Sequence, residues 1–111
     1  MEKTIFDYDP VNDSLFISHK SEHDRVKGSI VQDNISLDFT EDGRIVGIEI
    51  IGISGYLDEW GFDSEILNNI QEAKLIIHKK KGFIVCGIML NGQKIPLGLL
   101  PLNEQIIIHN Q

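Results

Sequence analysis

The stretch from residue 33 to residue 53 constrains the fold more than any other, because two apolar-alternating runs flank the dipeptide Asp42-Gly43. Asp-Gly is typical of two-residue hairpin loops, since both residues tolerate positive φ. Such a loop places the large apolar side chains of both runs on one face, whereas a slip by one residue would scatter them. The sequence therefore predicts a hairpin with the pairs Glu41–Arg44, Phe39–Val46, Leu37–Ile48 and Ile35–Ile50.

A second hairpin is predicted near the N-terminus. Residues 4–8 and 14–18 alternate apolar and polar side chains, and residues 9–13 between them combine proline with Asp and Asn. Proline fixes φ and the short polar side chains bond nearby backbone N–H groups, so this segment has turn chemistry. Residues 19–27 are polar and aperiodic and predict a loop, followed at 28–32 by a short strand or the approach to the central hairpin. The expected contacts of the hairpin are Tyr8 with Leu15 and Phe6 with Ile17.

The C-terminal half predicts two further hairpins. L-I-I-H at 75–78 and F-I-V-C-G-I-M-L at 83–90 flank a lysine-rich turn. Asn91-Gly92 is another two-residue hairpin loop, which leads into a strand at 94–100. Because Pro96 lacks an N–H, its strand is expected at a sheet edge. The predicted pairs are Ile88 with Ile95 and Cys86 with Leu97.

Between the two halves the strand periodicity stops. Residues 54–62 contain aromatic side chains among glycines and predict a loop or one helical turn over a sheet edge. Asp63 is a plausible N-cap for a short helix to about Glu72. The apolar stripe of this helix would be Ile66, Leu67, Ile70 and Ala73.

These patterns predict a mainly β (α+β) fold, with antiparallel hairpin-built sheets of seven or eight strands and one short helix near 63–72. Residues 106–108 are apolar and predict a last short strand. We expect residues 1–111 to form a single domain, made of a hairpin half (4–53), a connection (54–73) and a second β half (74–111).

Composition indicates a folded cytosolic protein. The chain has 111 residues, of which 41% are hydrophobic and 24% charged, enough for one globular core. A single cysteine, Cys86, excludes an internal disulfide and lies in an apolar run, so its thiol is expected to be buried. No run approaches the roughly 18 apolar residues of a membrane span, and the N-terminus lacks a signal-peptide pattern. We therefore expect a cytoplasmic protein with no membrane partner.

Charge is distributed unevenly along this acidic chain. The formal net charge of −7 argues against nucleic acid as the main partner, because phosphates would be repelled. Residues 1–73 carry 16 acidic and 5 basic side chains, whereas residues 74–111 carry 1 acidic and 5 basic. Such a molecule could associate head to tail or dock a basic partner on its acidic half. The alternative is a merely uneven surface.

The first half of the chain resembles a known family. The matching residues are Y-D at 8–9, D-x-L-F-I at 13–17 and L-D-F-x-E-D-G-R-I-V-G-I-E-I at 37–50. Together they resemble the bacterial and archaeal family called domain of unknown function 2283, over roughly residues 4–53. The resemblance implies a small β-rich domain with no established activity. Some members occur beside toxin-like genes, which implies an antitoxin-like partner role. Residues 54–111 lie outside the resemblance.

Asp38 and Glu49 are the most interesting pair of candidate site residues. In the predicted register Asp38 faces Gly47, and Glu49 is its diagonal neighbour on the same face, with Cβ atoms roughly 7–8 Å apart. Two carboxylates at this spacing could share a divalent ion or divide acid and base roles, with Asp7 or Asp9 added. The alternative is an ordinary solvated sheet face whose carboxylates accept nearby hydrogen bonds.

Two other polar groups are weaker candidates. His19 and His23 stand four residues apart, the spacing of a helical metal-binding pair, but they lie in a segment without a helix pattern. Solvated loop histidines are the alternative. The lysine run at 79–81 could contact RNA or phosphate, but it lacks interleaved aromatic residues. A solvated turn that guards a sheet edge is the plainer interpretation.

The aromatic residues Tyr56, Trp60 and Phe62 either close the end of the core or anchor a protein partner. We find no Ser/His/Asp or Cys/His arrangement and no phosphate-loop spacing, so no enzymatic activity and no cofactor are expected. The leading hypothesis is a non-catalytic interaction module, regulatory or antitoxin-like. It would form a homodimer or bind another protein through an edge strand or residues 54–62. The alternative is a metal-dependent hydrolase that uses Asp38 and Glu49.

Overall fold

A computed structural model describes residues 4–101, which form two antiparallel β-sheets and two short helical segments. Within this range the mainly β fold is confirmed. The helical segments are the α-helix α1 (Ile53–Glu59) and the 3-10 helix η1 (Ser64–Asn69). The strands are β1 (Ile5–Asp9), β2 (Ser14–Ser18), β3 (Val26–Gln32), β4 (Ile35–Thr40), β5 (Ile45–Ile51), β6 (Ala73–Lys80), β7 (Phe83–Leu90) and β8 (Gln93–Pro101).

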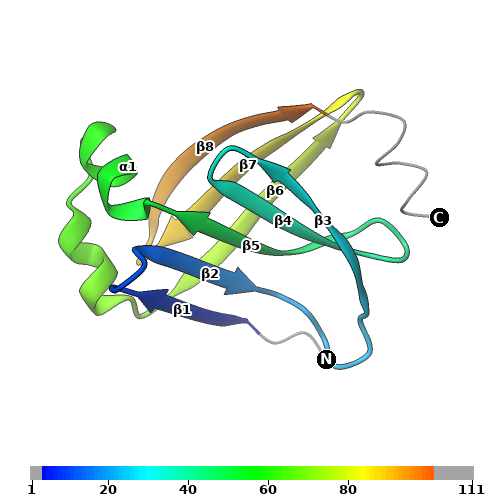
Figure 1. Cartoon of the computed structure of the whole chain (residues 1–111), viewed down its shortest axis with the longest axis horizontal. Coiled ribbons are helices and arrows are strands. Elements are labelled where there is room, and N and C mark those ends of the chain that lie inside the picture. Colours follow the sequence, from blue (N-terminus) through cyan, green and yellow to red (C-terminus); the bar gives the residue numbers. More distant parts are fainter. Residues whose placement is uncertain (1–3, 102–111) are drawn as a thin grey trace.

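The two sheets form a β-sandwich. One sheet has the strand order β1-β2-β5-β4-β3, and the other has the order β6-β7-β8. Figure 1 shows the three-stranded sheet lying over one face of the five-stranded sheet, with α1 and the following helical segment at one end. β6 contacts β2 and β5 across the space between the sheets. Each sheet therefore has one face toward the core and one outer face.

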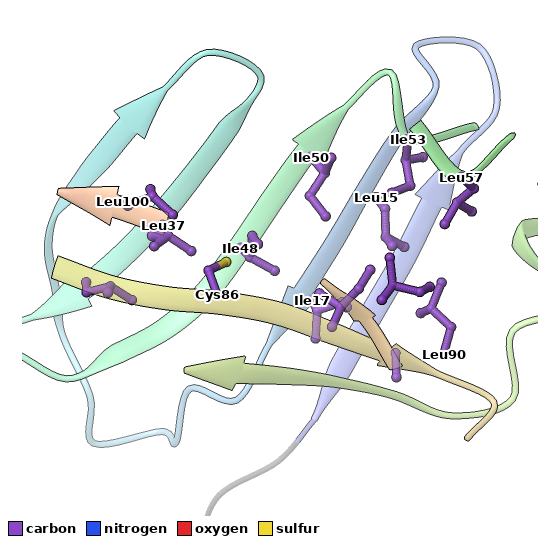
Figure 2. Packing of buried hydrophobic residues seen from close by; sticks show 14 of the residues in the cluster. Leu15, Ile17, Leu37, Ile48, Ile50, Ile53, Leu57, Cys86, Leu90 and Leu100 are labelled. Carbon is purple, nitrogen blue, oxygen red and sulfur yellow. The ribbon is translucent and has the colours of Figure 1, made fainter. Parts of the chain in front are cut away.

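The core fills the space between the sheets, because alternate residues of each strand point inward. Figure 2 shows inward side chains of both sheets meeting there, with Ile53 and Leu57 of α1 at one end. Burial of each such side chain contributes about 1.5–3 kcal/mol. The fully buried large side chains are Leu15, Ile17, Leu37, Ile48, Ile50, Ile53, Leu57, Ile84, Ile88, Leu90 and Ile95.

The central hairpin is confirmed over most of its length. Ile35 pairs with Ile50 and Leu37 with Ile48, as predicted. The predicted pairs beside the turn are wrong, because a bulge after Asp38 lets Phe39 pair with Ile45 in place of Val46. The N–H of Gly43, at φ 83°, donates to Thr40 O (3.0 Å), and the N–H of Thr40 donates to Arg44 O (2.9 Å). This is a β-turn with a glycine bulge, one residue longer than the predicted loop, so Arg44 lies across from Thr40 and not Glu41.

The other hairpins follow the same pattern of correct registers and local bulges. The predicted pairs Phe6–Ile17, Tyr8–Leu15 and Ile88–Ile95 are all observed. Asn91 and Gly92 have φ of 49° and 84°, as a primed two-residue turn requires. Cys86 faces Gly98 where Leu97 was expected, because a bulge in β8 next to Pro96 shifts the register by one residue. β8 is an edge strand, as Pro96 predicted.

The connection between the sheets differs from expectation in its helices. Residues 53–59 form α1, more regular than the predicted loop or single turn. A short helix near 63–72 is present, but it is a 3-10 helix that ends at Asn69, because Ala73 of the predicted stripe already belongs to β6. Asp63 is its N-cap and accepts the N–H of Glu65 at 3.0 Å. Within residues 4–101 no helix is long and apolar enough to cross a membrane. Residues 106–108 lie outside the described range.

Two turn residues at positive φ hold the ends of this helical connection. Asp13 (φ 51°) accepts the N–H and the hydroxyl of Ser54, the latter at 2.8 Å, and so caps α1 from the β1–β2 turn. Gly52, the residue before α1, supplies no side-chain cap. At the other end, Asn91 accepts the N–H groups of Gln71 (2.8 Å) and Glu72 (3.0 Å). The sheets and the connection are thereby tied together.

Candidate functional site

Acidic side chains gather on the outer face of the five-stranded sheet. The strand register sets Asp7, Phe16, Glu49, Ser36 and Val31 in one row across the sheet, Ile5, Ser18, Gly47, Asp38 and Ser29 in the next, and Asp9, Ser14 and Ile51 in a third. We call these residues the acidic face. Its rows contain four carboxylates and no lysine or arginine.

Asp38 and Glu49 share this face, as the sequence predicted, and each accepts a hydrogen bond from a different strand. The hydroxyl of Ser29 on β3 donates to Asp38 Oδ1 at 2.7 Å. The hydroxyl of Ser14 on β2 donates to Glu49 Oε2 at 3.2 Å. The two carboxylates are thus held by partners on opposite sides of the β4–β5 pair, and Ser36 on β4 lies directly across from Glu49.

Glu49 lines a shallow depression of about 410 Å³ on the acidic face, together with Asp7, Asp9, Asn12, Ser14, Phe16 and Ile51. The carboxylate of Asp9 is hydrogen-bonded within its own turn, where it accepts an N–H of the Asn12 side-chain amide at 2.7 Å. That bond holds the pKa of Asp9 below its ordinary value. Among residues 4–101, no three His, Cys, Asp or Glu side chains are grouped so that they could hold a metal ion.

The outer face of the three-stranded sheet has the opposite charge. Its rows are Lys74, Met89 and Lys94; Ile76, Gly87 and Pro96; His78, Val85 and Leu99; and Lys80, Phe83 and Pro101. We call these residues the basic face. Its rows contain three lysines and no acidic residue, and several apolar side chains lie between the lysines. Leu99 is 60% exposed and Phe83 36%. Sequence reasoning found the positive charge of this half but not its collection on one face.

The histidine candidates are placed apart. His19 accepts the N–H of Leu75 on β6 at its Nε2 (2.8 Å), while its Nδ1 lies 2.9 Å from the hydroxyl of Thr4. His19 therefore links the two sheets at the edge of β6. His23 lies in the exposed loop, with its Nε2 3.5 Å from Glu22. The loop interpretation of His23 fits this placement.

Of the three aromatic candidates, two belong to the core and one is exposed at the surface. Tyr56 and Phe62 pack against the core, and the Tyr56 hydroxyl donates to the carbonyl of Pro96 on β8. Trp60 is 59% exposed, with its ring centroid 6.0 Å from that of Tyr56. Tyr56 and Phe62 thus close the end of the sandwich, whereas Trp60 lies at its surface.

The surroundings of Cys86 and Lys79 indicate structural roles for both side chains. Cys86 is buried as expected, and burial raises the pKa of its thiol to about 11, which leaves it unreactive at neutral pH. Lys79, within the lysine run, is exposed and donates from Nζ to the carbonyl of Gly43 in the β4–β5 turn. One of the three lysines is therefore used to bridge the sheets, while Lys80 belongs to the basic face.

Sequence reasoning missed an ion-pair group at the end of the sandwich. Arg44 donates from Nε to Asp42 Oδ2 at 2.9 Å and from Nη2 to Asp24. The N–H of Ser21 also donates to Asp24 at 2.9 Å. The bond from Ser21, and next that from Arg44, hold the pKa of Asp24 below its ordinary value. The group ties the loop before β3 to the β4–β5 turn. No local sequence pattern predicts it, because 20 residues separate Asp24 from Arg44.

The fold and its faces define a small β-sandwich with an acidic and a basic outer face. Residues 5–54 match the model of a family described as a protein of unknown function (DUF2283), in agreement with the resemblance in sequence. The match covers β1 to β5 and the first two residues of α1, and thus the sheet with the acidic face. Neither a curated protein nor a solved structure matches the chain.

Proposed function

We propose that this chain is a non-catalytic protein-interaction module that docks partners on the outer faces of its sandwich. The observation that carries the proposal is the basic face, where Phe83 and Leu99 remain exposed between lysines. Exposed apolar patches rimmed by charge are typical of protein–protein interfaces. The apolar side chains supply affinity when they are buried, and the charges select and orient the partner.

The acidic face has the same mixed character. Ile5 is 50%, Val31 70% and Ile51 54% exposed, and all three share rows with carboxylates or serines. Both faces are open strand surfaces, in contrast to the enclosed, mostly apolar pockets that hold small-molecule substrates. Their chemistry therefore favours a macromolecular partner over a small molecule.

An affinity experiment with matched variants tests the proposal. The full chain serves as bait in extract from its own source cells, beside Phe83→Lys/Leu99→Lys on the basic face. Val11→Lys is the control, since Val11 is 89% exposed on the β1–β2 turn. We expect proteins, copies of this chain included, that the wild type and the control retain and the double variant loses. Identical captures by all three baits would contradict the proposal. A Trp60→Ala bait asks in the same experiment whether that aromatic is a further anchor.

The hydrolase alternative is tested by calorimetric titration with Mg²⁺, Mn²⁺ and Zn²⁺. Because Asp38 and Glu49 are each held by a serine of a different strand, we expect no binding heat. Saturable heat that disappears in Asp38→Asn/Glu49→Gln, with the fold intact by circular dichroism, would restore the metal-site hypothesis.

A further inference from the structure

We propose that the partner of each outer face is a second copy of this chain, with the acidic face of one molecule docked on the basic face of the next. This inference rests on the proposed function and names the partner. It starts from the separation of charge between the two sheets: the rows of one outer face carry Asp7, Asp9, Asp38 and Glu49, and those of the other carry Lys74, Lys80 and Lys94.

Charge complementarity selects this pairing over the alternatives. Two acidic faces in contact would oppose four carboxylates with four carboxylates, and two basic faces would oppose lysines with lysines, so both like pairings are repulsive. Only the unlike pairing matches the signs. It also covers apolar groups on both sides: Phe16, Ile51 and Val31 on one face, and Ile76, Val85 and Leu99 on the other.

The position of the faces fixes the kind of assembly. They are the outer surfaces of two stacked sheets, so they point in opposite directions (Figure 1). A contact between unlike faces is heterologous. Because the two faces lie on opposite sides of each subunit, every added subunit offers a free face to the next one, and the assembly does not close into a ring. The molecule measures 40 × 29 × 25 Å, so its broad faces are large enough for the about 800 Å² per partner of a standard interface. The expected product is an open-ended stack, and not the closed homodimer expected from sequence.

Sedimentation velocity of the full chain over a range of concentrations tests the assembly. We expect the weight-average mass to rise continuously above the monomer mass of 12.5 kDa, without a plateau at the dimer. Raising NaCl from about 50 mM to about 0.5 M shortens the Debye length several-fold, so association should weaken by about tenfold or more. A strict monomer at every concentration, or a dimer that saturates, would overturn the inference.

Charge-reversal variants identify the faces. Asp7→Lys/Glu49→Lys places two lysines beside Asp9 and Asp38, so the acidic face loses its net charge, and Lys74→Glu/Lys94→Glu makes both faces acidic; all four substituted side chains are exposed. Each variant alone should remain monomeric. Mixed in equal amounts, the two variants should associate as a pair, because the unchanged basic face of the first then meets the unchanged acidic face of the second. Failure of the mixture to assemble, with both variants folded by circular dichroism, would overturn the proposed pairing.

A control variant separates this effect from that of net charge. Asp58→Lys/Glu59→Lys in α1 changes the net charge by the same amount as Asp7→Lys/Glu49→Lys, but it lies outside both faces. It should assemble like the wild type; loss of assembly here would contradict a face-specific contact. The outcome is distinguishable from failure of the proposed function. A monomeric chain whose baits still retain another protein through Phe83 and Leu99 would refute self-association alone.

Discussion

At the scale of single residues, Asp13 connects the first hairpin to the start of α1. Its carboxylate accepts the Tyr8 hydroxyl at 2.8 Å as well as two groups of Ser54, and its carbonyl accepts the N–H of Gly52 at 2.8 Å. Burial alone would raise the pKa of Asp13, but the hydrogen bonds from Ser54 and Tyr8 outweigh burial and the pKa lies below its ordinary value. One side chain thus couples the first hairpin to α1.

This coupling predicts a pH-dependent contribution to stability. Because the folded pKa of Asp13 is depressed, its contribution is complete above the unfolded pKa, about 4, and is lost as pH falls through the folded value. Asp13→Asn keeps an acceptor and a residue type that tolerates φ 51°, but it does not titrate. In urea unfolding we expect the variant to be less stable than the wild type at pH 7, and the gap to narrow below about pH 4. A gap that is constant from pH 7 to pH 3 would contradict the assignment.

His19 predicts a second effect of a single residue. The edge strand β6 directs the N–H of Leu75 away from β7, and His19 Nε2 accepts it. His19→Leu leaves this part-buried donor without that acceptor and should lower the free energy of unfolding by about 1 kcal/mol or more. His19→Gln, whose side-chain oxygen can accept, should recover part of the loss. Chemical denaturation measures both, and equal losses in the two variants would argue against the hydrogen bond.

At the scale of elements, α1 depends on its surroundings more than on its own sequence. It has seven residues, no acidic residue in its first turn and no basic residue in its last. Isolated helices of this length are unstable in water. Burial of Ile53 and Leu57 and the cap from Asp13 therefore hold it in place. This explains why the sequence alone indicated at most one helical turn here.

Two glycines of this element have opposite expected effects on substitution. Gly55 lies within α1 with nothing within 4 Å of an added Cβ, so Gly55→Ala should stabilise the protein by about 0.5–1 kcal/mol. Gly52 precedes the helix at φ 77°, where Gly52→Ala should cost about 1–2 kcal/mol although the space is equally open. Thermal unfolding of both variants checks the signs. The same sign for both would show that backbone conformation does not decide the effect.

At the scale of the whole molecule, the two sheets share one core, so residues 4–101 are expected to unfold as one unit. Ile48 and Ile88 are fully buried on opposite sheets, and replacing either with Ala should cost about 2–5 kcal/mol. Each variant should shift the circular dichroism and Trp60 fluorescence midpoints together. The control Ile51→Ala, on the exposed side of β5, should stay within about 0.5 kcal/mol of the wild type. Separate midpoints for the two probes would indicate two domains.

Turn residues and apolar alternation were enough to predict the hairpins, most of their registers and the shared face of Asp38 and Glu49. These features depend on turn residues and on alternation between near neighbours, which local chemistry encodes. The sequence could not determine the bulges beside Phe39 and Pro96, because a single inserted residue leaves the apolar pattern almost unchanged.

The contacts between distant segments could be seen only in the folded molecule. The bond between Asp13 and Ser54 joins residues 41 positions apart, and the contact of His19 with Leu75 joins residues 56 apart. The packing of one sheet on the other likewise turned a difference in charge between two halves of the chain into two opposite outer faces. Such contacts depend on which surfaces the core leaves exposed, and that is fixed only when both sheets bury their apolar sides against each other.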